Sequence, residues 1–172
     1  FLQASWNYER MQNGGYAFAM IPAIKKLYKE KTEQIAALKR HMEFFNTHPY
    51  VAAPIIGVNL ALEQERANGA PVDDAAIQGV KVGMMGPLAG IGDTVWAGLM
   101  KPIFLSITLA WAMQGMIAGA WAYWLLAFGF DFGITYYMFM RGYKLGADSV
   151  DRFLEGGFVK TVTTAIGIVG MF

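Results

Sequence analysis

A run without any charged residue, from Pro102 to Phe130, constrains this chain more than any other feature. It is longer than the ~20 residues that an α-helix needs to cross a bilayer. Directly before it, residues 81–94 read KVGMMGPLAGIGDT, an apolar stretch interrupted by glycine and proline that includes a single acid, Asp93. Irregular backbone survives at membrane depth only where protein or trapped water satisfies its amides. The pattern therefore predicts a membrane protein of the transport class, with a cavity beside a spanning segment.

Charge is unevenly distributed along the chain. The 172 residues are 55% hydrophobic and 16% charged, whereas a typical soluble domain carries ~25% charged residues. Most of the charge lies between Lys25 and Lys81, and the stretch from Pro102 to Met140 carries only Asp131. The net charge of +1 gives no reason to expect a nucleic acid or another polyanionic partner. The sequence therefore predicts a polar part followed by a membrane part.

The residue inventory excludes several kinds of chemistry. The 172 residues include no cysteine, which excludes disulfides, thiolate catalysis and cysteine-ligated metals among them. The two histidines, His41 and His48, are too few for a histidine-rich metal site. Asp93 follows Gly92 where a phosphate-binding P-loop needs lysine, and the dinucleotide pattern GxGxxG is absent. We therefore predict no metal, no cofactor and no enzymatic site.

The first 31 residues predict an amphipathic or interfacial segment. Aromatic residues mix with charge up to Gln12, and the apolar stretch Tyr16 to Tyr28 ends beside Lys25, Lys26 and Lys29. Aromatic rings at headgroup depth and lysines on anionic lipid describe an interfacial helix. A packed helix with a solvated end fits equally well, so both interpretations stay open.

Residues 32–100 are predicted as a helical region. The first helix runs from Thr32 to about Asn46 and the second from Tyr50 to Arg66. The first shows an apolar face at helical spacing, formed by Ile35, Leu38, Met42 and Phe45.

A third helix leads into the glycine-rich stretch. Asp73 or Asp74 can cap its start. It is expected to run into a re-entrant element at residues 83–94, where glycines and a proline would break the helix.

Residues 101–172 are predicted to form transmembrane helices. Glycines divide the apolar run into a short helix over about 95–113 and a full span over about 116–140. Arg141 and Lys144 lie just past that span. By the positive-inside rule, these two charges weakly favour a cytoplasmic location for that end. The chain ends inside another apolar run, Thr161 to Phe172, so we expect further spans to be missing. The predicted fold class is an all-α, multi-pass integral membrane protein, with amphipathic and broken or re-entrant helices followed by transmembrane helices.

Asp93 is the strongest candidate for a functional residue. A carboxylate at the mouth of a broken helix can accept hydrogen bonds from sugar hydroxyls or from backbone amides, and ionisable groups at membrane depth are costly. Thr94 would add a polar contact, and Gly90 and Gly92 would allow close approach of helices or substrate. The alternative is that Asp93 only caps the helix that follows.

Other polar residues receive weaker assignments. Asn46 and Asn59, on or after the amphipathic helices, complete the candidate substrate-binding or translocation set. His48 precedes a proline in a turn, where a hydrogen-bonded loop residue is more common than a catalyst. A membrane hydrolase built on His48 and Asp93 has no nucleophile or metal set to support it. Asp131 could pair with Arg141 in a neighbouring subunit or mark a helix end at the interface, and a structural role is favoured.

Three long blocks resemble the IID component of the mannose-family (mannose/fructose/sorbose) sugar phosphotransferase system. They read WNYERMQNGGYAFAMIPAIKKLY (Trp6 to Tyr28), RHMEFFNTHPYVAAPIIGVNLALE (Arg40 to Glu63) and IQGVKVGMMGPLAGIGDT (Ile77 to Thr94). They stand in the order and spacing of the family, and the rest of the chain is compatible in hydropathy. Several long blocks in order are far more specific than a short motif.

The resemblance implies a membrane permease subunit of the bacterial cytoplasmic (inner) membrane. Such a IID component forms with a IIC subunit the unit that translocates hexose (mannose, glucose or a related sugar), thought to be a trimer of IIC–IID pairs. Soluble IIA and IIB subunits carry the phosphoryl group to the sugar, and IID itself carries none. Some family members also serve as receptors for bacteriocins.

The chain also departs from the family. Family members continue well past the position of Phe172, so the C-terminal part of the family is missing, and VWAGLMKP after Thr94 is less typical than the motif before it. A rival interpretation makes this chain a scaffold that does not contact sugar and provides a docking or bacteriocin-receptor surface of the same complex. Tolerance of polar substitutions between Gly86 and Thr94 would favour the scaffold.

Overall fold

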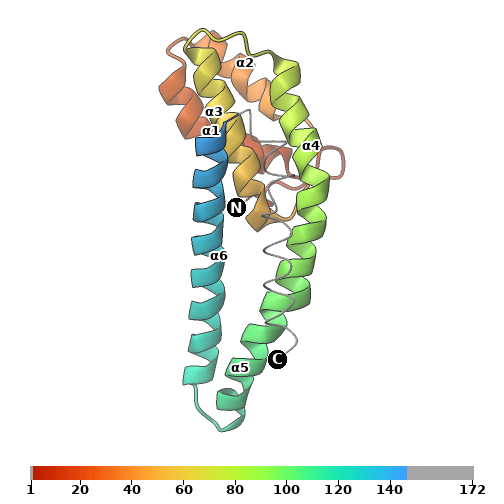
Figure 1. Cartoon of the computed structure of the whole chain (residues 1–172), viewed down its shortest axis with the longest axis vertical. Helices are drawn as coiled ribbons and strands as arrows, with labels where there is room; N and C mark the ends of the chain where they lie inside the picture. Colours follow the sequence, from red (N-terminus) through yellow and green to blue (C-terminus); the bar gives the residue numbers. More distant parts are fainter. Residues whose placement is uncertain (1, 147–172) are drawn as a thin grey trace.

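The computed structural model describes residues 2–146, which form a helical head and a long helical hairpin (Figure 1). The head contains α1 (Asn13–Leu27), α2 (Lys31–His41), the 3₁₀ helix η1 (Pro49–Ala52) and α3 (Ala53–Ala67). The hairpin contains α4 (Asp74–Gly92), the π-helix η2 (Asp93–Met100), α5 (Lys101–Met113) and α6 (Ala118–Leu145). Figure 1 shows α5 meeting α6 at the end far from the head. Within residues 2–146, β-structure is limited to isolated bridges.

A pairing between distant segments organises the head. The backbone N–H of Gln12 donates to the carbonyl of Phe45 over 2.8 Å, and Met11 bridges to the same residue. Because the chain after His41 bonds to this N-terminal segment, the helix predicted over 32–46 ends at His41 instead. The core beside this pairing is apolar and comes from α1, α3 and α4: Tyr16, Met20, Ile24, Ile55, Val58, Ile77 and Met84.

A charged network lies inside the head. The carboxylate of Glu63, fully buried, accepts from Arg40 at 2.8 Å, from the Nε2 of His41 at 2.9 Å and from the Tyr28 hydroxyl at 2.6 Å. Arg40 also donates to Asp74 at the start of α4, over 2.7 Å. Buried charges are tolerated only when they are paired and hydrogen-bonded, so this network ties α2, α3 and α4 together.

A second buried charge attaches α4 to the head. Lys81 is fully buried, and its ammonium lies 4.9 Å from the centre of the Tyr16 ring and 5.9 Å from that of Phe45. The ammonium also donates to the carbonyl oxygen of His41 over 3.4 Å. A cation over aromatic faces gains ~0.5–2 kcal/mol, which offsets part of the cost of burying the charge.

The glycine-rich stretch is helical. Residues 74–113 form one continuous helix, so the chain does not turn back at the re-entrant element predicted for 83–94. The apolar positions of α4 recur at helical spacing and pack on the head, and tertiary packing outweighs the ~1 kcal/mol helix penalty of each glycine. The irregularity that remains is the π-helix, in which Lys101 N–H bonds back to Trp96 just before Pro102. The predicted cap is confirmed, since the Asp73 side chain accepts from the Ala76 N–H over 2.7 Å.

The second arm of the hairpin, α6, crosses α3 at very short range. A Cβ added at Gly142 would lie 2.3 Å from the Pro54 carbonyl oxygen, and one at Gly57 would lie 2.4 Å from that of Phe139. Only glycine fits at both positions, so the two backbones touch there. The helix predicted over 116–140 is observed as α6, which extends to Leu145.

Among residues 2–146, the helix from Asp74 to Met113 is the one long and apolar enough to cross a bilayer by length and composition. Only 17% of its most apolar window is buried inside the chain. Its apolar surface therefore does not form the core of a soluble fold. The predicted run Thr161 to Phe172 lies outside the described residues.

Candidate functional site

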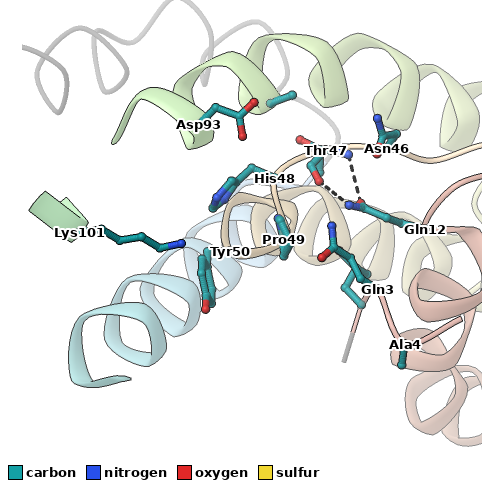
Figure 2. A pocket seen from close by; sticks show the side chains of 12 residues that line it. Gln3, Ala4, Gln12, Asn46, Thr47, His48, Pro49, Tyr50, Asp93 and Lys101 are labelled. Carbon is teal, nitrogen blue, oxygen red and sulfur yellow. Dashed lines mark hydrogen bonds between the residues drawn. The ribbon is translucent and has the colours of Figure 1, made fainter. Parts of the chain in front are cut away.

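A polar cavity of about 780 Å³ lies where the end of α4 passes the loop after α2 (Figure 2). Three segments far apart in the sequence form it: the N-terminal residues, the loop after α2 with the start of η1, and the continuous helix from Ala89 to Lys101. Its lining residues are Leu2, Gln3, Ala4, Gln12, Asn46, Thr47, His48, Pro49, Tyr50, Ala89, Asp93 and Lys101.

The cavity brings together two residues of the predicted set, Asp93 and Asn46. Asp93 begins the π-helix directly after α4, and Asn46 stands in the non-helical loop. Both residues are exposed and line the cavity. Figure 2 shows the Asp93 carboxylate above His48. Lys101 lies on the same side of the cavity as Asp93, with its ammonium directed toward Tyr50. The cavity thus presents both charge signs together with an amide.

Gln12 fixes the loop that carries Asn46. Its side-chain nitrogen donates to the Thr47 carbonyl over 2.7 Å, and its side-chain oxygen accepts from the Thr47 N–H over 3.1 Å (Figure 2). Gln12 is almost fully buried. Its amide bonds to both the N–H and the carbonyl of Thr47, as a neighbouring β-strand would, and so fixes this non-helical backbone. Gln12 was not among the predicted site residues, because a single glutamine before a helix forms no sequence pattern that would indicate its role.

Gly92 supports the cavity from behind. A Cβ at this position would lie 2.3 Å from the Cβ of His48 and 2.9 Å from a methyl group of Val51. The helix can pass the His48 loop this closely only because residue 92 has no side chain. Gly92 is thus placed at a helix–loop contact, not in the cavity lining.

His48 stands in the wall of the cavity. Its ring centre lies 5.2 Å from that of Trp96 and 5.6 Å from that of Tyr50. Burial lowers the pKa of His48, and the charge of Lys101 acts in the same direction, while the charge of Asp93 opposes both. The histidine is therefore neutral near pH 7 and contributes an aromatic surface to the cavity wall.

The π-helix η2 is hydrogen-bonded to α6 through Trp96, whose ring also contacts His48. The indole N–H of Trp96 donates to Asp131 over 2.5 Å, and Tyr50 stacks on the indole at 5.6 Å between ring centres. Asp131 lies within α6 and does not mark a helix end. Its contact with Trp96 supports the structural role favoured from the sequence.

Besides Gly92, three of the predicted site residues do not line the cavity. The Thr94 hydroxyl donates to the Gly90 carbonyl over 2.9 Å, and nothing lies within 4 Å of a Cβ added at Gly90. Asn59 is fully buried in the head core, where its amide donates to the Tyr16 hydroxyl over 2.7 Å. Among residues 2–146, no three acidic or histidine side chains lie close enough together to hold a metal ion.

Comparisons with known proteins address the family. The family model described as "PTS system mannose/fructose/sorbose family IID component" matches residues 1–172. The chain is 47% identical over 171 residues to the PTS system mannose-specific EIID component of Escherichia coli (strain K12), which covers 99% of this chain and 60% of that relative. It is 41% identical over 172 residues to the fructose permease IID component of Bacillus subtilis (strain 168), which covers 100% of this chain and 61% of that relative. The chain thus spans about three fifths of the length of these relatives.

Two solved structures share the fold. One is the cryo-electron microscopy structure of the mannose transporter ManYZ in complex with microcin E492, with a TM-score of 0.82 and 46% identity over 100% of this chain and 63% of that one. The other, described as a membrane protein, has a TM-score of 0.90 and 46% identity over the same shares. These likenesses confirm the predicted all-α membrane fold. The chain belongs to the mannose/fructose/sorbose family of PTS IID components.

Proposed function

We propose that this chain acts as the IID membrane subunit of a mannose-type sugar permease. With a IIC subunit it would form the unit that translocates hexose, coupled to phosphorylation of the sugar by IIA and IIB. Its relatives are named for mannose, sorbose and fructose, which supports a hexose as the cargo. The chain itself would carry no phosphoryl group and would catalyse no reaction. The full-length protein is expected to be multi-pass and to assemble as a trimer of IIC–IID pairs.

The polar cavity is the observation that carries this proposal. Its volume of about 780 Å³ lies within the ~300–1,000 Å³ of small-molecule sites. Asp93 can accept from sugar hydroxyls, Asn46 can donate and accept, and Lys101 can donate. The ring of Tyr50 provides an apolar face beside them. In the complex, the IIC subunit would close the open side of the cavity.

The distribution of charge supports one orientation in the inner membrane. Within residues 2–146, every lysine and arginine lies in the head, in the adjoining helix up to Lys101, or at the head end of α6. The hairpin tip between α5 and α6 carries none. By the positive-inside rule, the head faces the cytoplasm, where IIA and IIB would meet it, and the tip faces outward.

Sugar uptake by Asp93→Asn tests the proposal. The full-length subunit is expressed with its IIC, IIB and IIA partners, and uptake of radiolabelled mannose and glucose is measured together with the amount of assembled complex. Asp93→Asn keeps the shape of the side chain and removes its charge, so uptake should fall at least about tenfold with normal assembly. Thr94→Val is the matched control, because Thr94 is adjacent but does not line the cavity, and it should transport normally.

The rival function is a scaffold that does not contact sugar. In that case IIC alone would bind hexose, and this chain would provide packing surface and a docking face for IIB. Normal uptake by Asp93→Asn, with the complex assembled, would favour the scaffold and remove Asp93 from the mechanism.

A bacteriocin-receptor role is a second candidate function. The solved complex of ManYZ with microcin E492, at 46% identity to this chain, supports it. We expect cells that express the complex to become sensitive to a class of pore-forming bacteriocin. Asp93→Asn should leave this sensitivity unchanged, since receptor binding does not need transport.

A further inference from the structure

Two small cavities open side by side where α1, α3 and the end of α6 meet. Their volumes are about 430 Å³ and 300 Å³, and they share Gln64, Asn68 and Tyr143 in their linings. The Tyr143 hydroxyl bonds to the side-chain oxygen of Gln64 between them. Together they form one groove, the α1–α3–α6 groove, which is separate from the cavity that holds Asp93.

The groove is amphipathic. Its larger half has an apolar floor of Ala23, Leu27 and Leu60 with Lys26 at the edge. Its smaller half carries Lys144 and one carboxylate, Glu65. Both lysines are exposed, and within the described part of the chain neither makes an ion pair.

A membrane-crossing α6 would place the groove at headgroup depth. A hydrocarbon layer ~30 Å thick corresponds to ~20 helical residues. Trp121, which is 63% exposed near the start of α6, fits the outer interface belt. Counting ~20 residues from it reaches Arg141, which would put Tyr143 and Lys144 in the headgroup layer on the head side.

An apolar track leads from the groove into the hydrocarbon layer. Phe132, Tyr136 and Tyr143 follow one another along one face of α6 at spacings of four and seven residues. Phe132 is 66% exposed and Tyr136 is 59% exposed. Acyl chains can lie along this face while a headgroup occupies the groove.

We propose that the α1–α3–α6 groove binds the headgroup of an anionic glycerophospholipid whose headgroup carries hydroxyls, such as phosphatidylglycerol. The phosphodiester lies against Lys26 and Lys144, and the amide groups of Gln64 and Asn68 donate to its oxygens. A headgroup hydroxyl donates to Glu65. Basic pockets between transmembrane helices on the cytoplasmic side are the expected place for such headgroups.

Lipid titration of the purified full-length complex in detergent tests the proposal. Dioctanoyl phosphatidylglycerol, dioctanoyl phosphatidylcholine and glycerol 3-phosphate are titrated separately by calorimetry. A lysine near anionic lipid contributes ~1 kcal/mol, so Lys26→Gln should weaken phosphatidylglycerol binding about fivefold. Lys26→Gln with Lys144→Gln should weaken it about 20- to 30-fold, and Lys26→Arg should retain it.

The controls separate the alternatives. Lys25→Gln removes an adjacent exposed lysine that does not line the groove, so binding should stay within twofold of wild type. An equal loss in Lys25→Gln would indicate non-specific surface charge and overturn the proposal. Equally tight binding of phosphatidylcholine, or Lys26-dependent binding of glycerol 3-phosphate without acyl chains, would overturn it as well.

Discussion

At the scale of single residues, Glu63 holds the charged interior of the head together. Burial alone would raise the pKa of Glu63, but hydrogen bonds from His41 and Tyr28 and the charge of Arg40 lower it below its usual value. Burial lowers the pKa of His41 and outweighs the opposite effect of Glu63. The folded head therefore favours an ionised Glu63 beside a neutral His41.

Acid should destabilise the head in two steps. A lowered His41 pKa means that the unfolded chain binds the proton first, so stability falls as the pH drops below ~6.5. A lowered Glu63 pKa gives a second loss below ~4.3, as the pH falls through the folded value. The midpoint of thermal unfolding, measured from pH 7.5 down to about 2.5, should follow this course.

The variant His41→Gln identifies the first step. Glutamine still offers an N–H to Glu63 but does not titrate, so the loss of stability between pH 6.5 and 5 should shrink. A remainder is expected from His48, whose pKa burial also lowers. An unchanged slope in His41→Gln would show that the buried imidazole does not set the pH dependence.

Gly92 and Gly90 make opposite predictions although they are two residues apart. A Cβ at Gly92 would meet His48 at 2.3 Å, so Gly92→Ala should destabilise the protein by about 1–3 kcal/mol through overpacking. A Cβ at Gly90 meets nothing within 4 Å, so Gly90→Ala should stabilise the helix by about 0.5–1 kcal/mol. Thermal unfolding of the two variants in parallel checks this, and equal effects would contradict the helix–loop contact.

At the scale of elements, the π-helix η2 contacts the second arm of the hairpin through Trp96. It turns Trp96 toward α6, where the indole N–H bonds to Asp131. A wider helical turn re-aims the side chains that follow it, and such segments often mark functional positions. The same segment begins with Asp93, so the cavity wall and the contact with α6 share one element.

Removal of the indole N–H of Trp96 should weaken the contact between η2 and α6 and lower the stability of the protein. Trp96→Phe keeps an aromatic ring but removes the indole hydrogen bond to the Asp131 side chain, which should cost about 1–3 kcal/mol. Trp121→Phe is the matched control, because Trp121 is 63% exposed, and its effect should stay within about 0.5 kcal/mol. Equal unfolding midpoints for the two variants would show that the Trp96–Asp131 bond does not hold the arms together.

At the scale of the whole molecule, the head and the hairpin tip are predicted to lie on opposite sides of the membrane. The 172 residues contain no cysteine, so single cysteines introduced here can report topology once any cysteine elsewhere in the full-length complex is replaced. Gln114→Cys at the tip should react with an impermeant maleimide in intact cells, whereas Glu33→Cys in the head should react only after permeabilisation. Labelling of Glu33→Cys in intact cells would reverse the proposed orientation.

Much of this architecture could be predicted from local patterns. The charge-free run after Pro102, the aspartate cap at Asp73 and the apolar spacing of the helices all depend on neighbours close in sequence. Helix ends were predicted less well, because α2 stops at His41 where the chain pairs with Gln12. The break expected at residues 83–94 is absent, since packing of α4 on the head overrides the glycines.

The sequence by itself determined the helical class, the membrane character and the candidacy of Asp93, because hydropathy, periodicity and a lone acid are properties of contiguous residues. Only the tertiary structure decided which polar residues meet. It brought Asn46 and Asp93 into the lining of one cavity, set Gln12 and Lys101 in the same cavity and enclosed Asn59 in the head core. Contacts between distant segments depend on how helices cross, and crossing is governed by shape at positions such as Gly142, which no local pattern encodes.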